Sequence, residues 1–191
     1  MNLLGHLYLS QNETIESRLF NLLGDKYKGT ALLDLTDQGR AGIKMHRDID
    51  HFIDNHKDVL ELKHLISQKL PKVSGIAIDI LFDHLLAAEW HKFHIDELDV
   101  FIDCFFSKVY ENPRLVPKKH RAFVKNLEIN KYIHQYYDFS SVEAISSHLH
   151  RKLSFRTQID QTPNIFYTFE INIRETFEKY ISDARKTFGI S

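Results

Sequence analysis

The segment 74–94 places the strongest constraint on what this chain can fold into. Projected at about 100° per residue, its apolar side chains, among them Ile76, Phe82 and Trp90, surround the helix instead of forming one stripe. A helix that is apolar all round is buried by other elements. Helical spacing dominates the rest of the chain too, and glycine and proline are few. The sequence therefore predicts an all-α fold, a helical bundle around a central buried helix at about 74–94.

The chain length and the absence of a linker favour a single domain over 1–191. A chain of 191 residues can bury a full core, and no internal repeat, low-complexity tract or Pro/Ser-rich linker divides it. Breaks in the helical pattern fall at glycine and proline residues. We expect a loop or lid at 28–40, and helices over 2–10, 13–24, 40–56, 57–69, 74–94, 96–111, 117–126, 128–137, 140–153 and 163–187.

Charge and cysteine content narrow the functional classes. The formal net charge is −1, so no global field attracts nucleic acid or a membrane surface. No apolar run approaches the roughly 20 residues that cross a bilayer, and the N-terminus lacks the basic region of a secretory signal. The single cysteine, Cys104, cannot form a disulfide within the chain. We therefore expect a soluble cytoplasmic protein.

The segment 40–56 contains a first pair of candidate functional residues. His46 and Asp50 lie one helical turn apart, at the edge of the apolar face that Ile49 and Ile53 mark. Such a pair can chelate a metal, or the carboxylate can fix the tautomer of the imidazole. The alternative is a surface ion pair at i and i+4. The high histidine count, 12 in all, favours the functional interpretation.

The central segment contains a second group. Asp79 and Asp83 share one stripe in apolar surroundings, where adjacent carboxylates repel each other and resist desolvation. A divalent cation, or a cationic side chain from another helix, would relieve both problems. The alternative is a buried salt bridge or a helix cap. His84 projects about 100° from Asp83 and lies at the edge of the same group.

Further polar residues interrupt apolar sequence near the N-terminus. His6 alone would be a core histidine with a satisfied hydrogen bond, but beside the other groups it becomes a candidate ligand. Asn21 and Asp25 bracket an apolar run. Histidine and carboxylate ligands without cysteine suit Mn²⁺, Fe²⁺, Zn²⁺ or Mg²⁺, and metal-dependent phosphohydrolases use such ligands from several helices. Arg47, next to His46, can clamp a phosphate.

These residues occur in the order and spacing of a known family. The segments concerned are 2–9 (NLLGHLYL), 21–25 (NLLGD) with Lys28 and Gly29, 42–50 (GIKMHRDID) with Asp54, and 79–84 (DILFDH) with Trp90. Over roughly residues 1–90 the chain resembles the acyl carrier protein phosphodiesterases. Beyond about residue 95 the likeness is mainly one of length and helical character.

The resemblance implies a hydrolase that prefers Mn²⁺ and is distantly related to HD-domain phosphohydrolases. Such enzymes convert holo-acyl carrier protein to apo-acyl carrier protein and 4′-phosphopantetheine. They cleave the phosphodiester that joins the 4′-phosphopantetheine arm to a serine of the carrier protein. Fe²⁺, Mg²⁺ and Zn²⁺ remain alternatives. We expect catalytic roles for Asp25, His46, Arg47 and Asp50, substrate contacts from Asn21, Lys28 and Arg47, and metal ligands among Asp25, His46, Asp83, His6, Asp79 and His84.

The chain departs from the family pattern in two places. Gly5 and Gly24 stand where the family usually has alanine, a change that we expect to affect packing only. Asp83 precedes His84, whereas HD-domain enzymes have the order His-Asp. The roles of the HD-domain residues therefore cannot be assigned to Asp83 and His84 from the sequence motif alone. Asp83 is the safer ligand of the two.

Two other functions fit the same residues. A related phosphohydrolase could act on a nucleotide or another small phosphoester with the same metal ligands. A helical interaction module without catalysis would use the acids in structural ion pairs. For the leading hypothesis the partner is an acidic carrier protein, so we expect a basic docking patch. Its candidates are Lys118, Lys119, His120 and Arg121 with Lys125, and Arg151 and Lys152 with Arg156.

Overall fold

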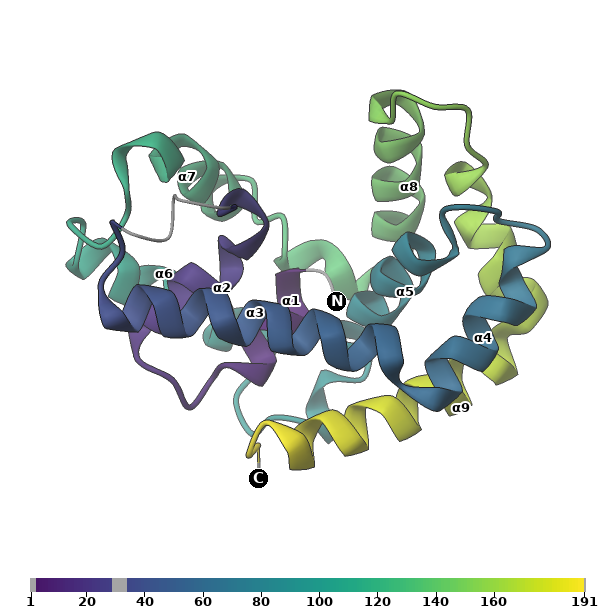
Figure 1. The fold of residues 1–191 in the computed structure, drawn as a ribbon, viewed down its shortest axis with the longest axis horizontal. Helices are drawn as coiled ribbons and strands as arrows, with labels where there is room; N and C mark the ends of the chain where they lie inside the picture. The colour runs from purple at the N-terminus through teal and green to yellow at the C-terminus, as the bar shows by residue number, and fades with distance from the viewer. Residues whose placement is uncertain (1–2, 29–33, 191) are drawn as a thin grey trace.

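Helix α5, Ser74–Ala88, runs through the middle of the computed structural model, which describes residues 3–28 and 34–190 (Figure 1). Most of its side chains are buried, which confirms the predicted central helix. It ends at Ala88 and not at 94, because the short 3₁₀ helix η3, Trp90–Lys92, follows. The helices packed around it include α1 (Leu3–Leu9), α4 (Lys57–Ser67), α8 (Ser140–Lys152) and α9 (Thr162–Thr187).

Helices α2 (Ile15–Leu22) and α3 (Asp37–Asn55) pack closely side by side. Each begins at a threonine N-cap, and the hydroxyl of Thr36 accepts a hydrogen bond from the Gly39 amide at 3.0 Å. The approach of the two helices requires glycine at position 42, because a β-carbon there would overlap the carbonyl oxygen of Ser17. The 3₁₀ helix η1, Gly24–Lys26, follows α2 and brings Asp25 toward α3.

The remaining elements complete an all-helical fold, with no strand in the parts of the chain that the structure describes. They are α6 (Leu98–Glu111), η4 (Lys118–His120), α7 (Arg121–Ile129), η5 (His134–Tyr137) and η6 (Ile159–Gln161). The predicted helix at 128–137 is wrong, because α7 ends at Ile129 and Lys131 turns the chain with a φ of 46°. Helix α9 bends at Phe169, whose φ and ψ are −123° and 26°.

Apolar side chains from every α-helix join one core, as the predicted bundle requires. In Figure 1, α7 lies over α2 and α6, while α8 stands apart from it beside α5. No helix within residues 3–28 and 34–190 combines the length and apolar character needed to cross a bilayer. Of the predicted loop or lid at 28–40, residues 29–33 lie outside the described residues and 37–40 form the first turn of α3.

Candidate metal centre

His6, His46 and Asp50 converge on one point, and we refer to these three residues as the convergent group. His6 comes from α1, and the other two lie one turn apart on α3. The Nε2 atom of His6 lies 3.2 Å from Asp50 Oδ1, and Nε2 of His46 lies 3.1 Å from Asp50 Oδ2. One ligand atom from each of the three residues lies within 4.8 Å of the others. Both imidazoles are buried, while the Asp50 side chain is 40% exposed, so His46 and Asp50 lie at the core edge as predicted.

Asn21 orients both histidine rings. Its side-chain Oδ1 lies 3.0 Å from His6 Nδ1, and its Nδ2 donates to the His6 carbonyl at 2.9 Å. Its backbone oxygen lies 2.8 Å from His46 Nδ1. Because both of these oxygens are acceptors, each Nδ1 carries the proton, and the lone pair of each neutral ring is on Nε2. Asn21 is fully buried, and these contacts hold the two histidines in place, while its predicted substrate contact stays a prediction.

The two Nε2 atoms fit a divalent cation. Both are buried and make no hydrogen bond of good geometry, although each lies close to Asp50. Buried polar atoms are normally hydrogen-bonded, and exceptions in native structures require an explanation. Two imidazole nitrogens and one carboxylate form a mixed N/O ligand set that suits Mn²⁺, Fe²⁺ or Zn²⁺.

Asp25 adds a second carboxylate on the solvent side. Its Oδ1 lies 3.4 Å from His46 Nε2, and its side chain is 92% exposed. The contact with His46 lowers the pKa of Asp25 below its usual range. The site therefore has two carboxylates near His46, one from α3 at the core edge and one from η1 at the surface.

Electrostatics distinguish the two histidines. Burial lowers the pKa of His6 to about 4, because the close carboxylate of Asp50 only partly offsets desolvation and the nearby His46 opposes a second positive charge. Burial also disfavours the charged form of His46, but the close carboxylates of Asp25 and Asp50 outweigh it and raise the pKa to about 9. For Asp50, these histidine contacts overcome burial and hold the pKa well below its usual range. One proton on His46 therefore occupies the place where a cation would bind.

Gly24 provides the space that the His46 ring occupies. A β-carbon at this position would overlap Cγ, Cδ2 and Nδ1 of the imidazole. The expectation that glycine at 24 affects packing only is therefore wrong, since the residue bears directly on where His46 can lie.

Asp83 and His84 are buried as expected but have other partners. The carboxylate of Asp83 accepts hydrogen bonds from the backbone amides of Leu4 and Gly5, at 2.9 and 3.0 Å. Burial raises its pKa to about 7, while these two hydrogen bonds act in the opposite direction. The Nδ1 atom of His84 lies 2.9 Å from the Tyr136 carbonyl oxygen. Neither residue belongs to the convergent group, so a ligand role for either one stays a prediction. Asp83 anchors α1, the helix that carries His6.

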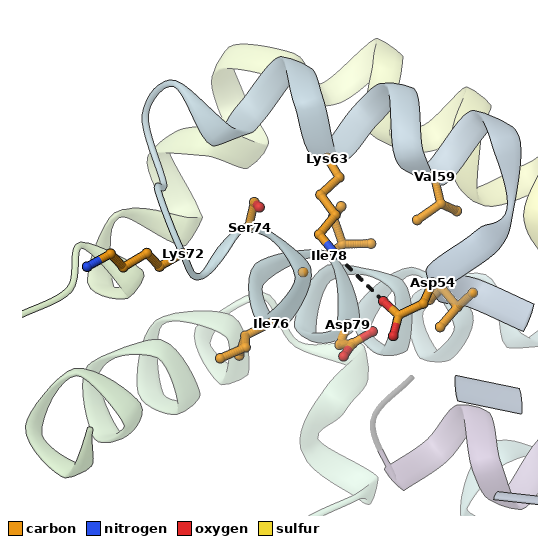
Figure 2. A pocket seen from close by; sticks show the side chains of 10 residues that line it. Asp54, Val59, Lys63, Lys72, Ser74, Ile76, Ile78 and Asp79 are labelled. Atoms are coloured by element: carbon orange, nitrogen blue, oxygen red, sulfur yellow. Dashed lines mark ion pairs between the residues drawn. The ribbon is translucent and has the colours of Figure 1, made fainter. Parts of the chain in front are cut away.

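Asp79 lines a separate cavity of about 500 Å³ between α4 and the start of α5 (Figure 2). Burial raises the pKa of Asp79. Figure 2 shows it beside Asp54, which pairs with Lys63 at 3.7 Å. Among the described residues it is not part of the convergent group, and its ligand role stays a prediction.

The two cationic residues predicted at the substrate are exposed. Arg47 lies on the outer side of α3, and its Nη2 approaches the Tyr27 carbonyl oxygen at 3.5 Å. Lys28 follows η1. Substrate contacts by both residues stay predictions.

A groove of about 670 Å³ opens beside the convergent group. Asp25 and Lys26 line it at η1, with walls from α7 and α8 that include Phe123, Asn126, Ala144 and His148. The sequence interpretation missed this feature. The wall residues lie on two amphipathic helices, α7 and α8. Nothing in the spacing of these residues indicates that the two helices face one another.

Comparison with known proteins covers nearly the whole chain. The family model for acyl carrier protein phosphodiesterase matches residues 1–184. A protein named acyl carrier protein phosphodiesterase from Pectobacterium atrosepticum is 29% identical over 89% of this chain and 86% of its own length. One of the same name from Photorhabdus laumondii is 29% identical, over 80% of this chain and 77% of the relative.

A further relative, from Salmonella agona, is 25% identical over 94% of this chain and 92% of its own length, and has the same name. No solved structure matches, so the likeness to HD-domain enzymes stays a prediction. The matched region contains all the residues of the convergent group and both walls of the groove. The chain therefore belongs to the acyl carrier protein phosphodiesterase family.

Proposed function

We propose that this protein is a metal-dependent phosphodiesterase that hydrolyses holo-acyl carrier protein to apo-acyl carrier protein and 4′-phosphopantetheine. The convergence of His6, His46 and Asp50 is the observation that carries the proposal. The names of the relatives support the substrate. Mn²⁺ is the cation that we propose, since the family resemblance implies it and a His/Asp ligand set accommodates it.

His6, His46 and Asp50 would hold the cation, and Asp25 would complete the set from the solvent side. A divalent cation in such a site polarises a phosphoryl oxygen and lowers the pKa of water. The hydrogen bonds from Asn21 keep Nε2 of both rings directed at the site. The chain therefore supplies an oriented pair of imidazoles before any cation binds.

In the proposed reaction a water oxygen forms a bond to phosphorus, and the bond from phosphorus to the serine oxygen breaks. The serine oxygen leaves with a proton, which regenerates the serine hydroxyl. Asp25 lies both beside His46 and on the wall of the groove, where it can accept a hydrogen bond from the attacking water. Arg47 supplies positive charge close to η1, where negative charge develops on the phosphoryl oxygens.

A basic surface on η4 and α7 would bind the acidic carrier protein. Lys118, Lys119, Arg121 and Lys125 are exposed, and Lys119 lies 4.7 Å from the centre of the Tyr27 ring, close to η1. His120, a predicted member of this patch, is buried and does not contribute to the exposed surface. The second candidate, Arg151, Lys152 and Arg156, is also exposed. Its first two residues line the groove.

The test is release of 4′-phosphopantetheine from holo-acyl carrier protein by the purified full-length chain, followed by mass spectrometry of the carrier. We expect turnover with Mn²⁺, none in excess chelator, and none in His46→Ala with an unchanged circular dichroism spectrum. Full activity in chelator would overturn the metal requirement. Turnover of small nucleotides without any release from the holo-carrier would favour the small-phosphoester alternative.

A further inference from the structure

We infer that the groove between α7 and α8 binds the pantetheine portion of the carrier protein's arm. The inference rests on the proposed function and assigns the groove a ligand. The proposed occupant is a flexible chain with two amides, apolar methyl and methylene groups and a terminal thiol, and it is attached to the carrier through a phosphodiester.

The groove lies beside the convergent group. Asp25 connects the two, because its carboxylate lies 3.4 Å from His46 Nε2 and the residue also lines the groove. A substrate with its phosphodiester at the convergent group therefore has the groove directly beside the scissile bond. The volume of about 670 Å³ falls within the range of small-molecule sites.

The lining matches the alternating character of the arm. Apolar surface comes from Leu3, Ile145 and Leu149, which suits methyl and methylene groups. Asn126 and Tyr132 supply polar groups among them. The side-chain amide of Asn126 makes no hydrogen bond within the described part of the chain, so it is available to an amide of the arm.

Charge supports the same orientation. Lys26, the neighbour of Asp25, lines the groove, and its ammonium lies 3.9 Å from the centre of the Phe123 ring. This contact holds a positive charge in the groove, on the residue next to Asp25, where it can attract the phosphodiester. Arg151 and Lys152 also line the groove, so its charged residues include three cations and one carboxylate.

The experiment measures how much the arm contributes to binding. The Mn²⁺-loaded full-length chain is titrated with apo-carrier protein and with a carrier whose arm is attached through a hydrolysis-resistant phosphonate. The ratio of the two dissociation constants isolates the arm from the protein–protein contact. Ala144→Trp fills the groove from an exposed position on α8. Glu143→Trp adds the same side chain to an exposed neighbour that does not line the groove.

In Ala144→Trp we expect the ratio to fall by about tenfold, which corresponds to ~1.4 kcal/mol, with unchanged affinity for the apo-carrier. Glu143→Trp is expected to retain the wild-type ratio. His148→Trp, also exposed and on the groove wall, should repeat the result of Ala144→Trp. Thermal melting of each variant checks that the fold is intact.

Two results would overturn the inference. One is an unchanged ratio in both groove variants. The other is an equal loss of affinity for both carriers in Ala144→Trp, which would mean that the groove holds the carrier polypeptide and not its arm. Failure of the wild type to release 4′-phosphopantetheine from the authentic holo-carrier is a separate outcome. It would reject the proposed hydrolysis, while the ratio would still report on the groove.

Discussion

The imidazole rings of His6 and His46 stack with their centroids 4.1 Å apart and their planes inclined by 16°. Two protonated imidazoles at this separation would repel each other strongly, which favours a single positive charge on the pair. Asp50 lies against both Nε2 atoms. The arrangement is consistent with a site that exchanges a proton for a metal cation.

Replacement of His46 should abolish tight cation binding. We expect His46→Ala to lower the affinity for Mn²⁺ by at least about 100-fold. The substitution removes one of the two nitrogen ligands, and this should cost more affinity than the loss of a residue that only orients a ligand. Isothermal titration calorimetry measures the effect. The matched control is His51→Ala, which alters an exposed histidine on the same helix. Equal loss in both variants would contradict the assignment.

Asn21→Leu should weaken the site without touching a ligand. The substitution removes both side-chain hydrogen bonds to His6 and leaves the backbone carbonyl that holds His46 in place. We expect a 10- to 100-fold lower affinity for Mn²⁺, in the range of second-shell mutations, and a loss of about 1–3 kcal/mol in unfolding free energy. Metal titration and urea denaturation measure the two effects. Wild-type metal affinity in this variant would exclude the orienting role.

Stability of the metal-free protein should fall at alkaline pH. The pKa of His46 is raised from 6.5 to about 9 in the folded state, so its contribution is fully present below pH 6.5 and is lost as pH rises through 9. Because solvent screens the exposed Asp25 and the partly exposed Asp50, we expect the loss of unfolding free energy to be about 1–2 kcal/mol, which is less than the full pKa shift would give. Urea denaturation at pH 6.5 and 9.5 measures it, and His46→Gln should remove most of the difference.

Close packing of α2 on α3 makes Gly42 sensitive to substitution. A β-carbon would overlap the Ser17 carbonyl oxygen, so the helices must separate, and we expect Gly42→Ala to cost about 1–3 kcal/mol. The control is Gly75→Ala, whose β-carbon would meet only the flexible end of Lys63 at 3.5 Å. Thermal denaturation should show little change or a small gain for Gly75→Ala. Similar effects for both would mean that the helices adjust without cost.

Charge reversal on η4 and α7 should slow turnover of the carrier protein. We expect Lys118→Glu with Lys125→Glu to lower kcat/KM for the holo-carrier by about tenfold at low salt, because the acidic carrier is no longer attracted. The difference from wild type should shrink as ionic strength rises. Steady-state kinetics from 50 to 500 mM salt test this. A salt dependence identical to that of wild type would place the docking surface elsewhere.

The sequence predicts burial well and the partners of buried groups poorly. The central helix and the His46–Asp50 pair follow from periodicity, because both depend on spacing within one helix. Asp83 and His84 are buried as expected, but their partners, Leu4 with Gly5 and Tyr136, are 79, 78 and 52 residues away. Such contacts depend on how helices pack, which local periodicity does not determine.

The same limit explains the other differences from the sequence interpretation. Asn21 is polar within apolar sequence, and this alone does not distinguish a residue that orients a ligand from one that binds substrate. Gly24 matters through a ring that lies 22 positions further along the chain. The groove depends on how α7 and α8 face each other, in the region where the family resemblance was weakest.

The hydrogen bonds from Leu4 and Gly5 to Asp83 provide a way to detect whether a cation is bound. A helix of seven residues is too short to persist by itself, so the place of His6 depends on α5. When the α1–α5 contact opens, one imidazole departs while α3 retains the other two ligands. The amide protons of Leu4 and Gly5 are therefore natural reporters of occupancy, since hydrogen exchange at these two positions should slow when a cation ties α1 to α3.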